Sequence, residues 1–162
     1  MGYSQKLLTL EQLPNWRAAQ RKAGHRVVVT NGCFDLLHAG HVSYLEAARA
    51  LGDVLLVGLN SDASVRTLKG PNRPINPETD RAIVLAALEA VSAVCIFEEP
   101  DATRFLTLAQ PDIYVKGGDY KWETLHAGER RAVESQGGQI RILPFVPGRS
   151  TTALLERLRN LR

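Results

Sequence analysis

The sequence predicts an α/β protein built on a Rossmann-like, doubly wound sheet of five parallel strands with helices on both faces. Short β-branched runs alternate with amphipathic helical windows, a pattern that indicates βαβ crossovers. The chain has 162 residues, of which 44% are hydrophobic and 23% charged, which suits one globular domain with a substantial core. No linker, internal repeat or low-complexity stretch divides it.

Residues 1–24 are expected to form an N-terminal helical leader, followed by a single domain over 25–162. Thr9 to Gln12 reads as a capping box, and Gly24 ends the amphipathic segment that follows. Within the domain, β-branched or apolar runs predict strands at 26–30, 53–59, 93–97, 113–116 and 139–144.

Helices are expected between these strands, at 40–51, 77–90, 101–109, 129–135 and from residue 151 nearly to the C-terminus. Asn76 is the expected N-cap of the second of them, with Pro77 at its first helical position. Ser150 is the expected cap of the last. Because ligands of such sheets bind beyond the carboxyl ends of the strands, we expect a site at the segments 31–41, 60–62, 116–120 and 147–152.

The strongest chemical signal is His38-Ala-Gly-His41, at the start of a predicted helix. Residues three apart lie on one helix face, so both imidazoles can address one ligand. The free N–H groups and dipole of a helix N-terminus favour phosphate, and Gly40 lets a ligand approach the backbone closely. The two rings can donate hydrogen bonds to phosphoryl oxygens as charge develops on them. Two helix-capping histidines are the plain structural alternative.

Other chemistry for the same segment is less well supported. The spacing of Cys33, His38 and His41 matches no usual zinc pattern, and no second cluster completes four ligands. Cys33 as a nucleophile lacks an acyl-transfer context. His25 and His126 stand alone and are expected on the surface.

Three further segments suggest anion binding. Lys69-Gly-Pro-Asn-Arg73-Pro is a basic loop, and Arg81 follows it in the next helix, where these cations could clamp a triphosphate. Val115-Lys116-Gly-Gly-Asp119-Tyr120 is a glycine turn directly after a strand. Gly148-Arg149-Ser-Thr-Thr152 places three hydroxyl groups at a helix start, which is both an anion site and an ordinary cap.

Together these segments resemble the HxGH nucleotidyltransferase superfamily. The closest resemblance is to the adenylyltransferase half of the bacterial heptose kinase/adenylyltransferase, or ADP-heptose synthase. The segments that carry it are Asn31-Gly-Cys-Phe-Asp-Leu-Leu-His-Ala-Gly-His41, Gly58-Leu-Asn-Ser-Asp62, Lys69-Gly-Pro-Asn-Arg-Pro-Ile-Asn-Pro77, Val115-Lys-Gly-Gly-Asp-Tyr120 and Ser150-Thr-Thr152. The resemblance covers residues 24–162.

This resemblance implies transfer of AMP from ATP to D-glycero-β-D-manno-heptose 1-phosphate, with release of pyrophosphate. It implies that His38 and His41 act at the α-phosphate, and that Lys69 and Arg81 hold the β- and γ-phosphates, with Mg²⁺ bridging them and no metal ligand assigned among the side chains. Lys116 and Arg73 would bind substrate. The implied nucleotide-binding residues are Gly32, Cys33, Phe34, Asp35, Gly40, Asn60, Asp119, Ser150, Thr151 and Thr152.

Partners and location follow from composition and resemblance. Twenty Lys and Arg against seventeen Asp and Glu give a net charge of +3, and their scatter argues against nucleic acid. No apolar run approaches the roughly 20 residues of a membrane span, and no export signal is visible, so a cytoplasmic protein with reduced Cys33 and Cys95 is expected. The resemblance suggests a homodimer.

Several acceptors are compatible with these motifs. In many bacteria this domain follows a sugar-kinase half, whereas here the short leader precedes it. Glycerol-3-phosphate cytidylyltransferase, another sugar-phosphate nucleotidyltransferase and a non-catalytic nucleotide-binding domain are the alternatives.

Overall fold

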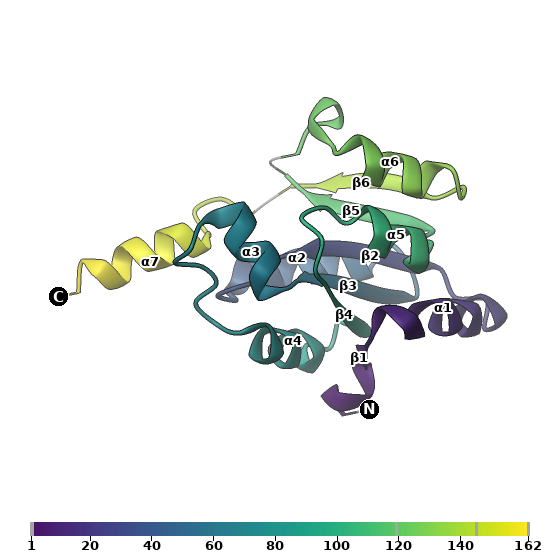
Figure 1. Ribbon diagram of the computed structural model, residues 1–162, viewed down its shortest axis with the longest axis horizontal. Coiled ribbons are helices and arrows are strands. Elements are labelled where there is room, and N and C mark those ends of the chain that lie inside the picture. The colour runs from purple at the N-terminus through teal and green to yellow at the C-terminus, as the bar shows by residue number, and fades with distance from the viewer. Residues whose placement is uncertain (1, 119, 145, 162) are drawn as a thin grey trace.

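The computed structural model describes residues 2–118, 120–144 and 146–161 and contains one sheet of six parallel strands in the order β1-β4-β3-β2-β5-β6 (Figure 1). Its strands are β1 (Leu7–Leu8), β2 (Val27–Gly32), β3 (Val54–Asn60), β4 (Ala93–Phe97), β5 (Ile113–Gly117) and β6 (Gln139–Leu143). The predicted α/β class is confirmed. The strand count differs by one.

Helices cover both faces of the sheet. The α-helices are α1 (Leu13–Lys22), α2 (Ala39–Arg49), α3 (Asp62–Lys69), α4 (Glu78–Ala87), α5 (Thr103–Ala109), α6 (Ala127–Glu134) and α7 (Thr151–Arg159). Three short 3₁₀ helices accompany them, namely η1 (Tyr3–Lys6), η2 (Leu10–Gln12) and η3 (Trp122–Thr124).

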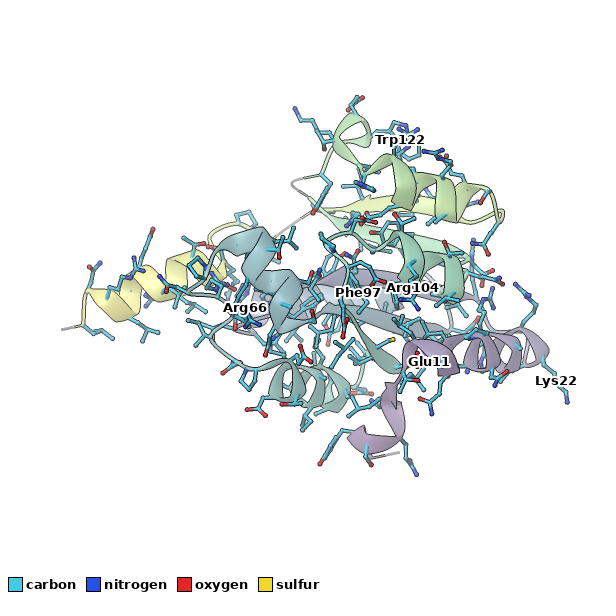
Figure 2. The ribbon with its side chains drawn as sticks, in the orientation of Figure 1. Glu11, Lys22, Arg66, Phe97, Arg104 and Trp122 are labelled. Atoms are coloured by element: carbon cyan, nitrogen blue, oxygen red, sulfur yellow. The ribbon has the colours of Figure 1, made fainter. Side chains whose placement is uncertain are left out.

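The core consists of two apolar layers, one on each side of the sheet. Leu45 of α2 and Leu85 of α4 pack in one layer, and Phe105 of α5 and Val133 of α6 pack in the other. Strand β3 contributes side chains to both layers, because alternate side chains of a strand point to opposite faces of the sheet. This explains its unbroken apolar run. Figure 2 shows Phe97 inside the body and Lys22 projecting from the end of α1.

The additional strand lies in the segment predicted as a helical leader. Leu7 and Leu8 pair in parallel with Val94 and Cys95, so β1 forms the edge of the sheet beside β4. The same segment contains the expected capping box and helix α1, whose Leu13 is fully buried. A two-residue strand carries no periodicity that a sequence pattern could reveal.

Two local features differ from the sequence-based expectation. Helix α3 begins directly after β3 and was not predicted; Ser61 caps it by accepting a hydrogen bond from the Ser64 N–H. Helix α4 begins at Glu78 with Pro77 as the N-cap residue, so Asn76 does not cap it. The Asn76 side chain donates instead to the Asp35 carbonyl oxygen.

Strands β2, β3 and β5 lie side by side at the centre of the sheet, so the segments that follow them meet at one edge. Helix α7, drawn in yellow, projects from that edge and has no buried residue (Figure 1). Among the residues that the structure describes, no helix is long and apolar enough to cross a membrane.

Candidate active site

A cavity of about 570 Å³ opens at the carboxyl edge of the sheet. Its size is typical of small-molecule sites. Most residues predicted for the site line this cavity: Gly32, Cys33, Phe34, His38, Gly40, His41, Asn60, Lys69, Arg73, Lys116, Ser150, Thr151 and Thr152. The chain thus brings together residues that lie up to about 120 positions apart. Asp35 and Arg81 lie behind the cavity wall, and Asp119 is outside the described residues.

The two histidines stand at the first turn of α2. His38 is the N-cap residue, and the His38 and His41 rings stack with centroids 3.9 Å apart and planes at 30°. His38 Nδ1 accepts a hydrogen bond from the Gly40 N–H at 3.1 Å, and His41 Nδ1 accepts one from the His38 N–H at 3.3 Å. Because each Nδ1 is an acceptor, each neutral ring carries its proton on Nε2. The pair therefore offers two N–H donors.

Both rings are neutral near pH 7. Burial lowers the pKa of His41 to about 4, and repulsion from His38 and Lys69 adds to the effect. Burial also lowers the pKa of His38, with a further contribution from Arg149. Neutral imidazoles that donate from Nε2 are suited to stabilising an oxyanion without first losing or gaining a proton.

Gly40 allows this stack to form. A Cβ atom at this position would lie 2.9 Å from the His38 ring and 3.2 Å from the Cβ of Arg149. Any side chain would therefore displace either the ring or the segment that carries Arg149. The glycine in the motif is explained by close approach within the protein, in addition to the approach of a ligand.

The turn after β2 shapes the floor of the cavity. Phe34 has a φ of 43°, in the left-handed region, and its ring centroid lies 5.5 Å from that of His41. A non-glycine residue held there costs roughly 1–3 kcal/mol, which the surrounding packing must offset. Burial raises the pKa of the Cys33 thiol despite the nearby cations Lys69, Arg81 and Arg73, so Cys33 is a neutral thiol at pH 7.

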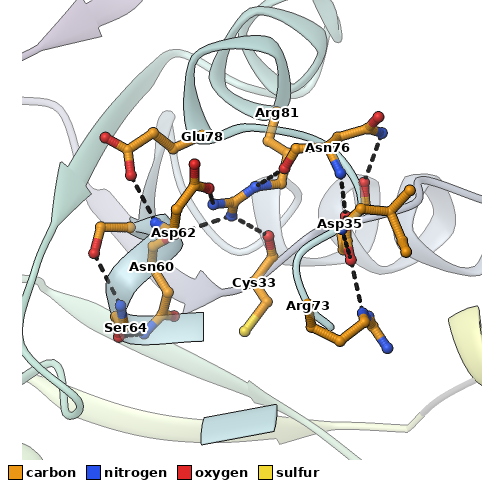
Figure 3. A network of polar contacts seen from close by, with 11 residues as sticks. Cys33, Asp35, Asn60, Asp62, Ser64, Arg73, Asn76, Glu78 and Arg81 are labelled. Atoms are coloured by element: carbon orange, nitrogen blue, oxygen red, sulfur yellow. Dashed lines mark hydrogen bonds and ion pairs between the residues drawn. The ribbon is translucent and has the colours of Figure 1, made fainter. Parts of the chain in front are cut away.

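Asp35 fixes the basic loop to the end of β2. Its carboxylate is 1% exposed and accepts hydrogen bonds from Arg73 Nε at 2.8 Å, from the Ile75 N–H at 2.8 and 2.9 Å, and from the Asn76 N–H at 2.9 Å (Figure 3). Burial raises the pKa of Asp35, but these donors outweigh it, and the net pKa lies below the usual value. Asp35 thus positions the loop rather than lining the pocket.

Arg81 has a comparable scaffold role, which differs from the predicted contact with phosphates. Its side chain is fully buried, and its guanidinium donates to the carbonyl oxygens of Asn76, Cys33 and Asn60 and to Asp62 Oδ1 at 2.7–3.0 Å (Figure 3). These contacts join the ends of β2 and β3 to the start of α4. Four of its five N–H donors are occupied, so Arg81 holds the cavity wall in place from behind.

Sequence reasoning did not single out several cavity residues, of which Glu129 is the most notable. Glu129 is 5% exposed and belongs to α6, where it looked like an ordinary residue of an amphipathic helix. Its Oε2 lies 3.3 Å from Lys116 Nζ, and Lys116 Nζ also donates to Asn31 Oδ1 at 3.1 Å. Asn31 and Gly117 also line the cavity and lie in segments that were expected to form the site, whereas the lining residues Tyr44, Leu68, Pro100 and Val146 were not expected.

The remaining wall is cationic or rich in hydroxyl groups. Lys69 is the last residue of α3, and Arg149 precedes the α7 cap Ser150, whose Oγ accepts from the Ala153 N–H. Among the described residues, no group of three or more His, Cys, Asp or Glu side chains could hold a metal ion.

The chain is similar in sequence to known proteins. A family model described as cytidylyltransferase-like matches residues 29–157. A protein of Trichlorobacter lovleyi named bifunctional protein HldE is 52% identical over 153 residues, which cover 94% of this chain and 31% of that protein. A protein of the same name from Nitratiruptor sp. is 54% identical over 139 residues, covering 86% and 29%. The chain thus spans less than a third of the length of these relatives.

The chain is also similar to proteins of known structure. A lipopolysaccharide core biosynthesis protein from Thermoplasma volcanium superposes with a TM-score of 0.63 at 27% identity, covering 76% of this chain and 98% of its own. Pantoate-β-alanine ligase from Francisella tularensis superposes with a TM-score of 0.57 over 90% of this chain and 68% of its own, at 14% identity. The second similarity concerns the fold alone.

Proposed function

The chain belongs to the cytidylyltransferase-like family of nucleotidyltransferases, and we propose that it transfers AMP from ATP to D-glycero-β-D-manno-heptose 1-phosphate. The products are ADP-heptose, a precursor of lipopolysaccharide, and pyrophosphate. The observation that carries the proposal is the stacked pair His38 and His41, which offers two Nε2–H donors beside a cluster of cations. The relatives named HldE support a sugar phosphate as acceptor.

The reaction needs no nucleophile from the protein. An oxygen of the sugar phosphate forms a bond to the α-phosphorus of ATP, and the bond from that phosphorus to the bridging oxygen of the β-phosphate breaks. The electron pair leaves with pyrophosphate. The protein contributes by aligning two anions and by stabilising the charge that spreads over the α-phosphoryl oxygens.

The cavity residues divide these tasks. His38 and His41 donate hydrogen bonds to the α-phosphoryl oxygens, and the free backbone N–H groups at the start of α2 reinforce them. Lys69 and Arg73 neutralise the pyrophosphate as it leaves. The turn Gly32 to Phe34 and the hydroxyl groups of Ser150 to Thr152 bind the nucleotide. Mg²⁺, carried in by the triphosphate, would supply further charge neutralisation on the β- and γ-phosphates.

The deciding experiment is a pyrophosphate-release assay that crosses ATP and CTP with heptose 1-phosphate, glycerol 3-phosphate and other sugar phosphates. We expect the highest kcat/KM for ATP with heptose 1-phosphate. A higher value for CTP with glycerol 3-phosphate would assign the chain to the alternative cytidylyltransferase activity. No release with any pair would favour a nucleotide-binding domain without catalysis.

The histidine assignment has its own test. His41→Ala removes one oxyanion donor, a loss that typically costs about 10²–10³ in kcat, while calorimetric binding of a non-hydrolysable ATP analogue should change by less than about threefold. His25→Ala is the matched control, since His25 lies outside the cavity. Full turnover in His41→Ala would remove the catalytic role of the pair.

A further inference from the structure

A buried polar cluster lies at the cavity wall formed by β2, β5 and α6. Lys116 of β5 and Glu129 of α6 are each 5% exposed, and Asn31 is near the end of β2. Lys116 Nζ lies 3.1 Å from Asn31 Oδ1 and 3.3 Å from Glu129 Oε2. All three residues line the cavity. Nothing in the reaction described above requires a carboxylate here.

The lysine keeps bonding capacity for a ligand. An ammonium group has three N–H donors, and two of those of Lys116 point to Asn31 and Glu129. The rings of Tyr120 and Tyr114 lie 4.6 and 5.3 Å from Nζ, distances at which an aromatic ring attracts a cation. Among the described residues, Asn31 and Glu129 are the two side chains that take a hydrogen bond or ion pair from Lys116 Nζ, so its third N–H can meet a ligand in the cavity.

The carboxylate is held independently of the lysine. Glu129 Oε1 accepts the Ala102 N–H at 3.0 Å. The single proton of the Tyr114 hydroxyl is shared between Asn31 Oδ1 at 2.6 Å and Glu129 Oε2 at 3.0 Å, so the Ala102 N–H is the main contact that holds Glu129 apart from the lysine. Glu129 therefore stays in place when Lys116 engages a ligand. A side chain fixed by such secondary contacts can orient the group that touches the substrate.

Several cations line the cavity, among them Lys69, Arg73 and Lys116. Lys69 ends α3 and Arg73 belongs to the loop that Asp35 holds, whereas Lys116 stands on β5 beside Glu129 and Asn31. Burial lowers the pKa of Lys116, and Glu129 acts in the opposite direction. Transfer between two phosphorylated substrates needs cations for two anions, and Lys116 is a cation on a different element from Lys69 and Arg73.

We propose that Glu129 is a positioning residue, which holds the Lys116 ammonium charged and oriented at the cavity wall so that Lys116 binds the phosphate of the acceptor. This inference rests on the proposed function for the identity of the acceptor. The ligand class that the pair recognises is a phosphate monoester dianion. Without Glu129, burial would favour the neutral amine, which has no net charge to attract the anion.

The groups that face Lys116 among the described residues define the pH dependence. They are Glu129 from α6, Tyr114 from the same strand and Tyr120 from the turn that follows, while Tyr44 of α2 contacts the neighbouring Val115 carbonyl oxygen. Burial and Glu129 raise the pKa of Tyr114 well above its ordinary value, so this phenol stays neutral across the range of interest.

The test measures binding of sulfate, whose charge is constant from pH 6 to 10, by calorimetry with a non-hydrolysable ATP analogue present. In Glu129→Gln, the amide oxygen can still accept the Ala102 N–H, so the fold should persist. We expect sulfate affinity within about threefold of wild type at pH 6.5 and at least about tenfold weaker at pH 9, a loss worth about 1.4 kcal/mol. In a plot of sulfate affinity against pH, the alkaline limb is the fall in affinity at high pH as Lys116 loses its proton. In Glu129→Gln this alkaline limb should move to lower pH.

Two further variants assign that limb. Lys116→Met should abolish it, and Glu134→Gln, which changes an exposed carboxylate on the same helix, should retain the wild-type curve. An alkaline limb in Glu129→Gln that coincides with the wild-type limb would overturn the inference, whatever its thermal stability. Saturable sulfate binding with this pH pattern but no pyrophosphate release with any acceptor would refute the proposed function and leave the role of Glu129 standing.

Discussion

Replacing Asp35 with asparagine should destabilise the protein by roughly 2–4 kcal/mol. Removing one partner of a buried ion pair costs about 3–5 kcal/mol when the other charge remains buried. The side chain of Arg73 is 17% exposed and can regain part of that loss from water. An asparagine keeps one acceptor oxygen. With that oxygen in the Oδ1 position, the Ile75 and Asn76 N–H groups stay bonded but the NH₂ group faces Arg73 Nε; in the opposite orientation, the Asn76 N–H loses its acceptor. In either orientation at least one donor loses its partner.

Urea and thermal denaturation measure this effect. For a chain of this size, each kcal/mol shifts Tm by about 2–4 °C, so we expect a fall of roughly 4–16 °C. Asp53→Asn is the matched control, because its carboxylate is at an exposed site and accepts one backbone N–H, from Arg26; it should cost at most about 1 kcal/mol. A double-mutant cycle with Arg73→Gln should give a coupling energy of about 1–3 kcal/mol.

The pH dependence of stability in acid provides an independent check of the role of Asp35. The folded-state pKa of Asp35 lies below its ordinary value, so its contribution is present above about pH 3.9, the unfolded value, and is lost as pH falls through the folded pKa. The stabilities of wild type and Asp35→Asn should therefore converge in acid. A cost no larger than that of Asp53→Asn, or a difference that does not depend on pH, would refute the role assigned to Asp35.

Three further outcomes are expected. Arg81→Lys should lower the free energy of unfolding, measured with urea, by about 2–4 kcal/mol, because an ammonium group cannot make the four hydrogen bonds of the planar guanidinium. A decrease below about 1 kcal/mol would contradict the scaffold role. Gly58→Ala should cost about 1–3 kcal/mol, since its Cβ would lie 2.5 Å from the Phe105 ring, which stacks on Phe97; an unchanged Tm would show that the ring can move. Burial depresses the pKa of His41 to about 4, so the unfolded chain takes up a proton at this ring before the folded protein does. As pH falls from 6.5 to 4, the free energy of unfolding of wild type should therefore drop by roughly 2 kcal/mol relative to that of His41→Asn. If the two free energies fell in parallel with pH, the ring of His41 would not be held neutral.

The parts of the fold that sequence patterns predicted are those with enough residues to display a period. The central strands and the helices that cover them showed such patterns, and the glycines and caps marked their ends. Strand β1 has two residues, and its place in the sheet depends on pairing with β4. A single residue, Ser61, separates the end of β3 from the start of α3, so the first turn of the helix fell in a segment whose sequence resembled a loop.

The site residues that could be predicted are those that local backbone geometry alone brings together. The pair His38 and His41 is informative because helical spacing alone brings the two rings together. The destinations of Arg81 and Glu129 could not be inferred, because their partners lie on other elements: Arg81 bonds to the ends of β2 and β3, and Glu129 meets Lys116 of β5. A charged residue in a helix gives no signal of burial until the packing is known.

Helix α7 has a thermodynamic consequence that follows from its lack of buried residues. Its N-terminal residues Ser150 to Thr152 form part of the cavity wall, and Thr151 Oγ1 reaches the Leu36 carbonyl oxygen at 3.4 Å. Amide hydrogens along α7 should therefore exchange quickly in the free protein. A ligand that binds these hydroxyl groups binds only the form in which residues 150–152 lie at the cavity wall, so it should slow that exchange. The exchange rate of the α7 amides therefore measures how much of the cavity is occupied by ligand.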